Sequence, residues 1–228
     1  MGRLYYITGG AGSGKSEYAE QLAERLHTEL GGPLYYVATM NPAPRDSDAA
    51  ARIAKHQKRR AGRGYTTLEC PTDIAQLHAQ AFKNAVFLLE DLTNLYANEV
   101  YGTSGHPHEI VTPLLELTQQ AGAVIIVANE LYSDGITYAS ETDRFLRDLA
   151  DLAAELSATA DQVTEVVYGI PVQLKACDID VCHVPAAKHD GALPRRFPGH
   201  ADRPVANHTD TPSPHCGRRS EGVICSIH

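Results

Sequence analysis

The sequence contains no tryptophan, only two methionines, and a single cysteine, Cys70, before residue 176. A disulfide scaffold is therefore excluded for this part of the chain, which suits a reducing compartment. Long apolar runs are missing as well, since segments such as 121–128 are far shorter than the roughly 20 residues of a membrane-spanning helix. The first apolar segment leads straight into a glycine-rich loop, so we expect no signal peptide, no membrane span and a cytoplasmic protein.

An excess of positive charge is also absent. The net charge of -8 argues against general nucleic-acid binding. The basic residues are nevertheless unevenly distributed, because seven of them fall between residues 45 and 63, and this predicts either a local anion site or a solvated helix face. These residues are Arg45, Arg52, Lys55, Lys58, Arg59, Arg60 and Arg63.

One motif organises what is present. The pattern G-x-x-x-x-G-K-S follows an apolar run at 4–8 and precedes a helical pattern at 15–30. This arrangement is typical of a phosphate-binding P-loop, whose glycines let successive N–H groups converge on phosphate oxygens. Lys15 is predicted to reach the β- and γ-phosphates, and Ser16 to bind Mg²⁺. The predicted phosphate-binding residues are Gly9, Gly10, Ala11, Gly12, Ser13, Gly14, Lys15 and Ser16.

Strand and helix patterns alternate along residues 1–175, which predicts a doubly wound, mostly parallel α/β sheet. We expect strands at 4–8, 34–39, 65–69, 85–89, 123–128, 163–169 and 171–175, with a turn at 169–171. We expect helices at 15–30, 47–61, 72–83, 92–101 and 108–121, and one opened by a capping box of Ser140 and Asp143.

An acidic pair follows the apolar strand expected at 85–89. A carboxylate at the end of a buried parallel strand suits the Mg²⁺ side of a P-loop site, and we assign this role to Glu90. Asp91 is interpreted as the N-cap of the helix expected at 92–101.

The composition changes at residue 176. Residues 176–228 are rich in proline, histidine and cysteine and show no apolar periodicity. This predicts a folded domain at 1–175 followed by a low-complexity, disordered tail. The cysteines and histidines of the tail match no zinc-binding spacing.

Taken together, these segments resemble the bifunctional adenosylcobinamide kinase/adenosylcobinamide-phosphate guanylyltransferases of cobalamin biosynthesis. The resemblance covers about residues 3–175 and depends on the order and spacing of several motifs. They lie at 8–16, 36–40, 52–56, 66–69, 88–95, 129–130 and 168–171. Asp91 departs from the cysteine that many members have there, and 130–135 departs from a glycine-rich form.

The resemblance implies a RecA-like P-loop fold, a homotrimer and two reactions. ATP or GTP first phosphorylates the aminopropanol hydroxyl of adenosylcobinamide, and GMP from GTP is then placed on that phosphate through a GMP-histidine. His56 is the histidine that the resemblance identifies. The further nucleotide-binding residues that it implies are Ala38, Thr39, Met40, Gln57, Lys58, Arg59, Arg60, Glu69 and Glu90.

The residues around His56 favour the same role. Arg52, Arg59 and Arg60 lie three or four residues from it and so share its face of the expected helix. There they could bind the triphosphate and offset the charge that grows on pyrophosphate. Their positive charge would also lower the pKa of the imidazole and keep it an unprotonated nucleophile.

Two other functions explain fewer features. A single-step P-loop kinase of another small molecule would use the basic segment only to grip phosphate. A nucleotide-dependent switch protein would catalyse no transfer, but the sequence has no N-K-x-D motif for reading guanine. Covalent labelling with GMP distinguishes the two-step transferase from both.

Overall fold

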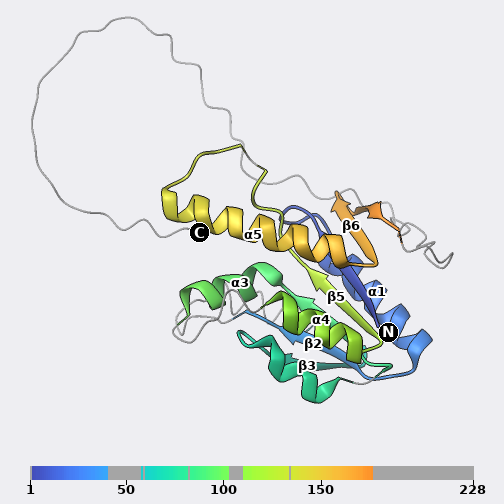
Figure 1. The fold of residues 1–228 in the computed structure, drawn as a ribbon. Helices are drawn as coiled ribbons and strands as arrows, with labels where there is room; N and C mark the ends of the chain where they lie inside the picture. Colours follow the sequence, from blue (N-terminus) through green and yellow to red (C-terminus); the bar gives the residue numbers. More distant parts are fainter. Residues whose placement is uncertain are drawn as a thin grey trace, which may run out of the picture. The chain divides into compact units, whose positions relative to one another are not determined.

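A mostly parallel sheet forms the centre of the computed structural model, which describes residues 2–40, 58, 60–81, 83–102, 110–133 and 135–176 (Figure 1). Within these residues the sheet has seven strands in the order β3-β2-β4-β5-β1-β6-β7. Every neighbouring pair is parallel except β6 and β7, which form an antiparallel hairpin. The strands are β1 Arg3–Thr8, β2 Leu34–Ala38, β3 Tyr65–Glu69, β4 Val86–Glu90, β5 Ala123–Val127, β6 Gln162–Val167 and β7 Ile170–Lys175.

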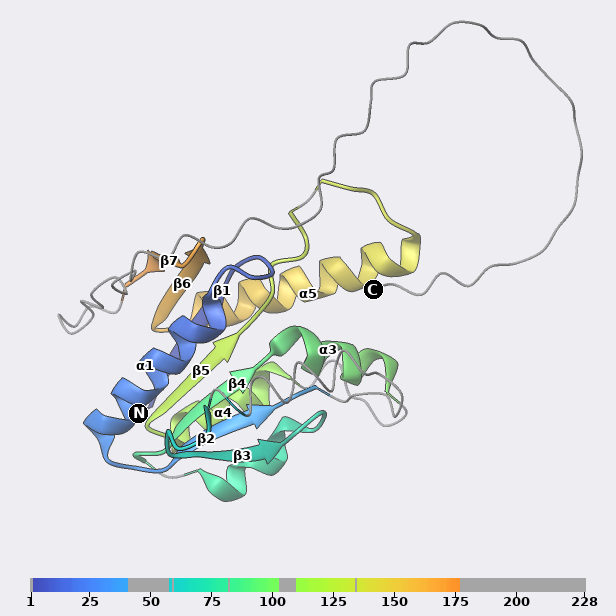
Figure 2. The ribbon, with the colours of Figure 1, turned by 180° about the vertical axis from the view of Figure 1, so that it is seen from behind.

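Helices cover both faces of the sheet (Figure 2). One face packs against α1, and the other packs against the remaining described helices. The helices are α1 Lys15–Leu30, the 3₁₀ helix η1 Ile74–Gln80, α3 Leu92–Tyr101, α4 Val111–Gln120 and α5 Ser140–Thr159. The predicted doubly wound, mostly parallel α/β sheet is therefore confirmed.

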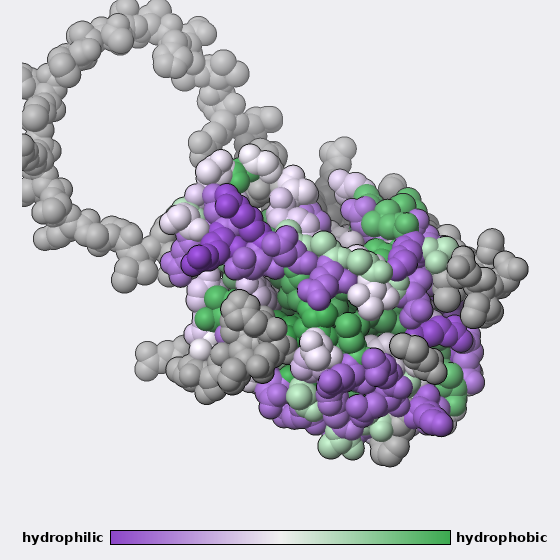
Figure 3. Space-filling model, viewed as in Figure 1, coloured by the Kyte–Doolittle hydropathy of each residue, from purple (hydrophilic) through white to green (hydrophobic). Residues whose placement is uncertain are grey.

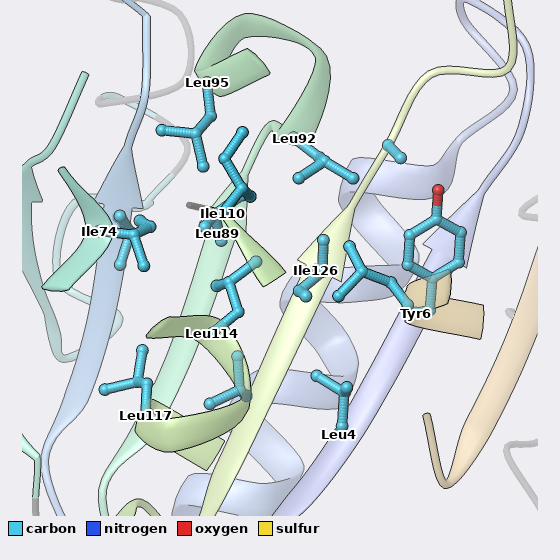
Figure 4. Close-up of a cluster of buried hydrophobic side chains, with 14 of the residues drawn as sticks. Leu4, Tyr6, Ile74, Leu89, Leu92, Leu95, Ile110, Leu114, Leu117 and Ile126 are labelled. Carbon is cyan, nitrogen blue, oxygen red and sulfur yellow. The ribbon is translucent and has the colours of Figure 1, made fainter. Parts of the chain in front are cut away.

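Alternation along the strands explains the two cores. In β1, Leu4 and Tyr6 join the larger hydrophobic cluster, under α3, α4 and α5, whereas Tyr5 and Ile7 face α1. Figure 4 shows part of the larger cluster, with Leu4 and Tyr6 on the sheet opposite the helical leucines. A strand covered on both faces must be apolar at successive positions, which is the pattern seen in the sequence.

Three predicted element boundaries are corrected. The helix expected at 72–83 is the shorter η1, because Asp73 adopts a left-handed conformation and Gln76 N donates to Asp73 O, three residues back. The predicted capping box is shifted: Ala139 is the N-cap of α5, and the Asp143 carboxylate accepts from Tyr138 N instead. The turn lies at 168–169, not 169–171, because Val167 pairs directly with Ile170.

Two predicted segments lie mostly outside the described residues. Of the helix expected at 47–61, Lys58 and Arg60 are described and are helical, and Ala61 already belongs to a turn. The tail beyond residue 176 is not described, so its disorder and the domain border at 175 stay predictions. Among the described helices, none combines the length and the apolarity needed to cross a membrane.

Candidate nucleotide-binding site

The glycine-rich loop joins β1 to α1, as the motif predicts. Gly14 is the N-cap of α1 in a left-handed conformation, with φ of 94°. Gly9 passes so close to β6 that a Cβ there would lie 2.5 Å from Val166 O. Both positions therefore require glycine, the first for its dihedral angles and the second for space.

Lys15 is held inside this loop. Its side chain is only 7% exposed, and Nζ donates to Gly10 O at 3.1 Å. Burial lowers the pKa of Lys15, while the nearby carboxylates of Asp91 and Glu90 oppose that effect. A buried ammonium whose partner is a backbone carbonyl is well prepared to exchange that partner for phosphate oxygens.

The carboxyl ends of the parallel strands bring predicted residues from separate parts of the chain to one edge. Ala38 pairs with both Glu69 and Glu90, and Glu90 pairs with Val127 next to β1. With strands about 4.8 Å apart, Glu90 is about 10 Å from β1, but Glu69 is about 19 Å away. Glu90 therefore lies near the P-loop at this edge, whereas Glu69 lies at the far end of the edge.

Asp91 is the N-cap of α3, as the sequence predicts. Its Oδ1 accepts from Asn94 N at 2.7 Å, and its Oδ2 accepts from Asn129 Nδ2 at 3.1 Å. Burial raises the pKa of Asp91, against the lowering effect of the Asn94 hydrogen bond. Both Asp91 oxygens are thus engaged in structural hydrogen bonds, and Glu90 stays the predicted metal ligand.

The oxygen donors at this edge fit Mg²⁺. The Ser16 hydroxyl belongs to the first turn of α1, and the Glu90 carboxylate closes β4. The charges of Glu90 and Asp91 both reach the Lys15 ammonium, so the acidic pair stands close to the loop. Hard oxygen ligands with one or two carboxylates are what Mg²⁺ prefers when it is bound together with substrate phosphates.

Thr39 and Met40 follow β2 at the same edge. Thr39 is fully buried, and its hydroxyl is hydrogen-bonded to the backbone of Asp91. Its carbonyl accepts from Asn98 Nδ2 at 2.7 Å. The Thr39 side chain thus joins two strand ends, and a nucleotide contact from this segment stays a prediction.

Two members of the basic segment are engaged with the fold. Arg60 is buried, with Cζ 3.2 Å from the centroid of the Tyr36 ring. Arg63 forms ion pairs with Glu20 and Glu24 on α1, at 3.0 and 2.8 Å. Arg63 therefore supports the fold. The predicted anion site would be formed by other basic residues of the segment. The predicted residues Arg52, His56, Gln57 and Arg59 lie outside the described residues.

Some contacts at the site have no counterpart in the sequence analysis. Gly169 N donates to Ser13 O, and Asn129 joins Asp91. The sequence contains the motifs at 129–130 and 168–171, but spacing alone does not reveal their partners. No sequence pattern indicates that Arg60 packs on Tyr36.

A P-loop with a buried lysine and an acidic strand end at the carboxyl edge of a parallel sheet defines a P-loop nucleotide-binding protein. The family described as cobinamide kinase/cobinamide phosphate guanyltransferase matches residues 5–174. The chain belongs to this family, and it is an enzyme, a nucleotide-dependent kinase and guanylyltransferase of cobalamin biosynthesis.

The match to curated relatives covers nearly the whole length of those relatives. The chain is 33% identical over 189 residues to the bifunctional adenosylcobalamin biosynthesis protein CobU of Escherichia coli, covering 75% of this chain and 99% of that protein. It is 31% identical over 175 residues to CobP of Pseudomonas aeruginosa, covering 74% and 95%. Among solved structures, it is similar to the flagellar accessory protein FlaH of Methanocaldococcus jannaschii, with 12% identity, coverage of 76% and 78%, and a TM-score of 0.46.

Proposed function

We propose that this enzyme phosphorylates the aminopropanol hydroxyl of adenosylcobinamide and then transfers GMP from GTP, through a GMP-histidine at His56, to give adenosylcobinamide-GDP. The observation that carries the proposal is the P-loop with Lys15 buried beside Glu90, in a chain whose family is described by these two reactions. A phosphate-binding loop alone would fit many kinases. The family match over 5–174 supplies the substrate class.

In the kinase step, the loop N–H groups and Lys15 bind the β- and γ-phosphates of ATP or GTP. Ser16 and Glu90 would hold Mg²⁺, which when bound neutralises charge on the phosphate oxygens. The substrate hydroxyl oxygen attacks the γ-phosphorus, the bond to the β-phosphate oxygen breaks, and the hydroxyl proton is released. The nucleoside diphosphate leaves.

In the guanylyl step, a neutral His56 nitrogen attacks the α-phosphorus of GTP and pyrophosphate leaves. An oxygen of the cobinamide phosphate then attacks the same phosphorus and breaks the P–N bond, which restores the imidazole. Arg52 and Arg59 would offset charge on the leaving pyrophosphate. Arg60, four residues after His56 in the sequence, packs on Tyr36 of β2.

The test is incubation with α-labelled GTP and Mg²⁺, followed by denaturing electrophoresis. We expect a covalent label that survives base and disappears in mild acid, as a phosphoramidate should. His56→Ala should lose the label and still phosphorylate adenosylcobinamide. His78→Ala is the matched control, because His78 hydrogen-bonds Pro113 O far along the chain from the basic segment, and it should keep the label.

The same experiment decides between the alternatives. Label that persists in His56→Ala would move the nucleophile to another residue. A wild-type enzyme with kinase activity but no label would favour the single-step kinase. From the resemblance we also propose a cytoplasmic homotrimer, which light scattering of the purified protein would check for its subunit number.

A further inference from the structure

The turn of the β6–β7 hairpin touches the phosphate loop. Gly169 N donates to Ser13 O at 2.7 Å, so the turn is hydrogen-bonded directly to the loop backbone. Tyr168 and Gly169 both have positive φ, at 50° and 80°, which is the conformation that a two-residue hairpin turn needs. The Tyr168 side chain is 91% exposed, and the outer part of the hairpin presents apolar surface (Figure 3).

The turn also packs closely against the loop. A Cβ on Gly14 would lie 3.3 Å from the Cα of Gly169, so the two backbones are in close contact. The strand before the turn is itself paired with β1, with Thr8 opposite Glu165. The hairpin is therefore a rigid support beside the loop.

This contact sets the direction of one peptide group. Ser13 C=O and Gly14 N–H belong to the same trans peptide, so they point in opposite directions. With the carbonyl held by Gly169, the Gly14 N–H faces away from the hairpin. Backbone N–H groups at the start of α1 are the donors that a P-loop offers to phosphate.

We propose that Gly169 is a positioning residue for phosphate binding, because its N–H orients the Ser13–Gly14 peptide in the binding-competent direction. Glycine is needed there for its left-handed backbone alone, since a Cβ on Gly169 would meet nothing within 4 Å. The inference rests on the proposed function only in that the loop must bind nucleotide phosphates.

The test compares two glycines of the same conformation. Gly31 is the C-cap of α1, at the opposite end of that helix from the loop, with φ of 66° and open space around a Cβ. For Gly169→Ala and Gly31→Ala we would measure the melting temperature, the dissociation constant of mant-GTP with Mg²⁺, and competition by inorganic tripolyphosphate. Both variants should have a lower melting temperature than wild type. Only Gly169→Ala should bind mant-GTP and tripolyphosphate more weakly, by about tenfold, which is the loss expected for one misdirected hydrogen bond to a charged group.

Two further variants separate positioning from general stability. Gly169→Asn should recover most of the affinity, because asparagine tolerates the left-handed region. Tyr168→Gly keeps the Gly169 N–H and should bind like wild type. If Gly169→Ala does not fold, Gly169→Asn and Gly31→Asn give the same comparison. The loss of affinity in Gly169→Asn should then be smaller than the tenfold loss expected for Gly169→Ala.

The outcomes distinguish this inference from the proposed function. Unchanged affinity in both Gly169 variants, beside a wild type that binds, overturns the inference alone. A loss for mant-GTP without a loss for tripolyphosphate also overturns it, because the turn would then act on the base. A wild type that binds neither compound overturns the inference and the proposed function together.

Discussion

Thr39 and Asp91 hold each other by two hydrogen bonds between the ends of β2 and β4. Thr39 Oγ1 donates to Asp91 O at 2.8 Å and accepts from Asp91 N at 2.7 Å. One hydroxyl therefore satisfies both backbone groups of the residue that follows Glu90. The position of the predicted metal carboxylate depends on this small side chain.

Thr39→Val should destabilise the protein by about 1–3 kcal/mol, because valine keeps the shape but leaves the buried N–H of Asp91 without its partner, whereas the Asp91 carbonyl still accepts from Leu95 N. Thr39→Ser keeps the hydroxyl and should cost less than about 1 kcal/mol. Urea unfolding measures both. Thr66→Val, at an exposed position of β3, is the control and should be near neutral. Equal stability of the valine and serine variants at 39 would contradict the argument.

As the pH rises, nucleotide affinity should begin to fall at a lower pH than it would if the lysine at position 15 were exposed. Burial lowers the pKa of Lys15, so its charge is complete below that pKa and is lost as the pH rises through it. The dissociation constant of mant-GTP from about pH 7 to about pH 10 measures this loss. Lys15→Arg should bind more weakly but with a flatter profile, because guanidinium stays charged. If the dissociation constants of wild type and Lys15→Arg depend on pH in the same way, the titrating group is not Lys15.

Removal of the Lys15 charge should abolish most nucleotide-dependent activity. In Lys15→Ala we expect a folded protein, because the one hydrogen bond lost is that of Nζ to Gly10 O, and alanine suits the first turn of α1. Circular dichroism checks the fold, and both transferase reactions are assayed. Turnover at the wild-type rate would disprove the P-loop assignment.

Arg63→Ala should lower stability without weakening nucleotide binding. Glu20 is 1% exposed and loses a charged partner, whereas Arg63 is a third exposed, so we expect about 1–2 kcal/mol. Lys58→Ala, an exposed basic residue of the same segment, is the control and should leave stability unchanged. If Arg63→Ala is as stable as wild type but binds mant-GTP more weakly, Arg63 belongs to the anion site and not to the support of the fold.

Truncation after Lys175 should leave an active enzyme with the same melting temperature. The last described strand ends at Lys175, and the sequence beyond it has no core-forming pattern. Truncation after Val167 is the contrasting variant, because it removes β7 and Gly169 and should abolish nucleotide binding. A drop of many degrees in the first variant would show that the tail contributes to the fold.

The sequence predicts best where structure is local. The glycine motif and apolar periodicity predict α1 at its observed bounds, and the apolar runs predict β4 and β5 to within one residue. The shorter η1 was missed because Asp73 N donates to Glu99 on α3, a tertiary contact that no local pattern contains. Strand order and the Arg60–Tyr36 contact likewise depend on residues that are distant in sequence, and the role of His56 is still a prediction.

The pairing of β1 determines when the binding loop can first exist. β1 is synthesised before the other six strands of the described sheet, yet Ile7 pairs with Val127 on one side and Thr164 on the other. Both neighbours leave the ribosome late, and such long-range closure is slow. An N-terminal half released by premature termination would carry the complete glycine motif and no structured loop. Nucleotide binding during synthesis would therefore report that nearly the whole sheet has formed.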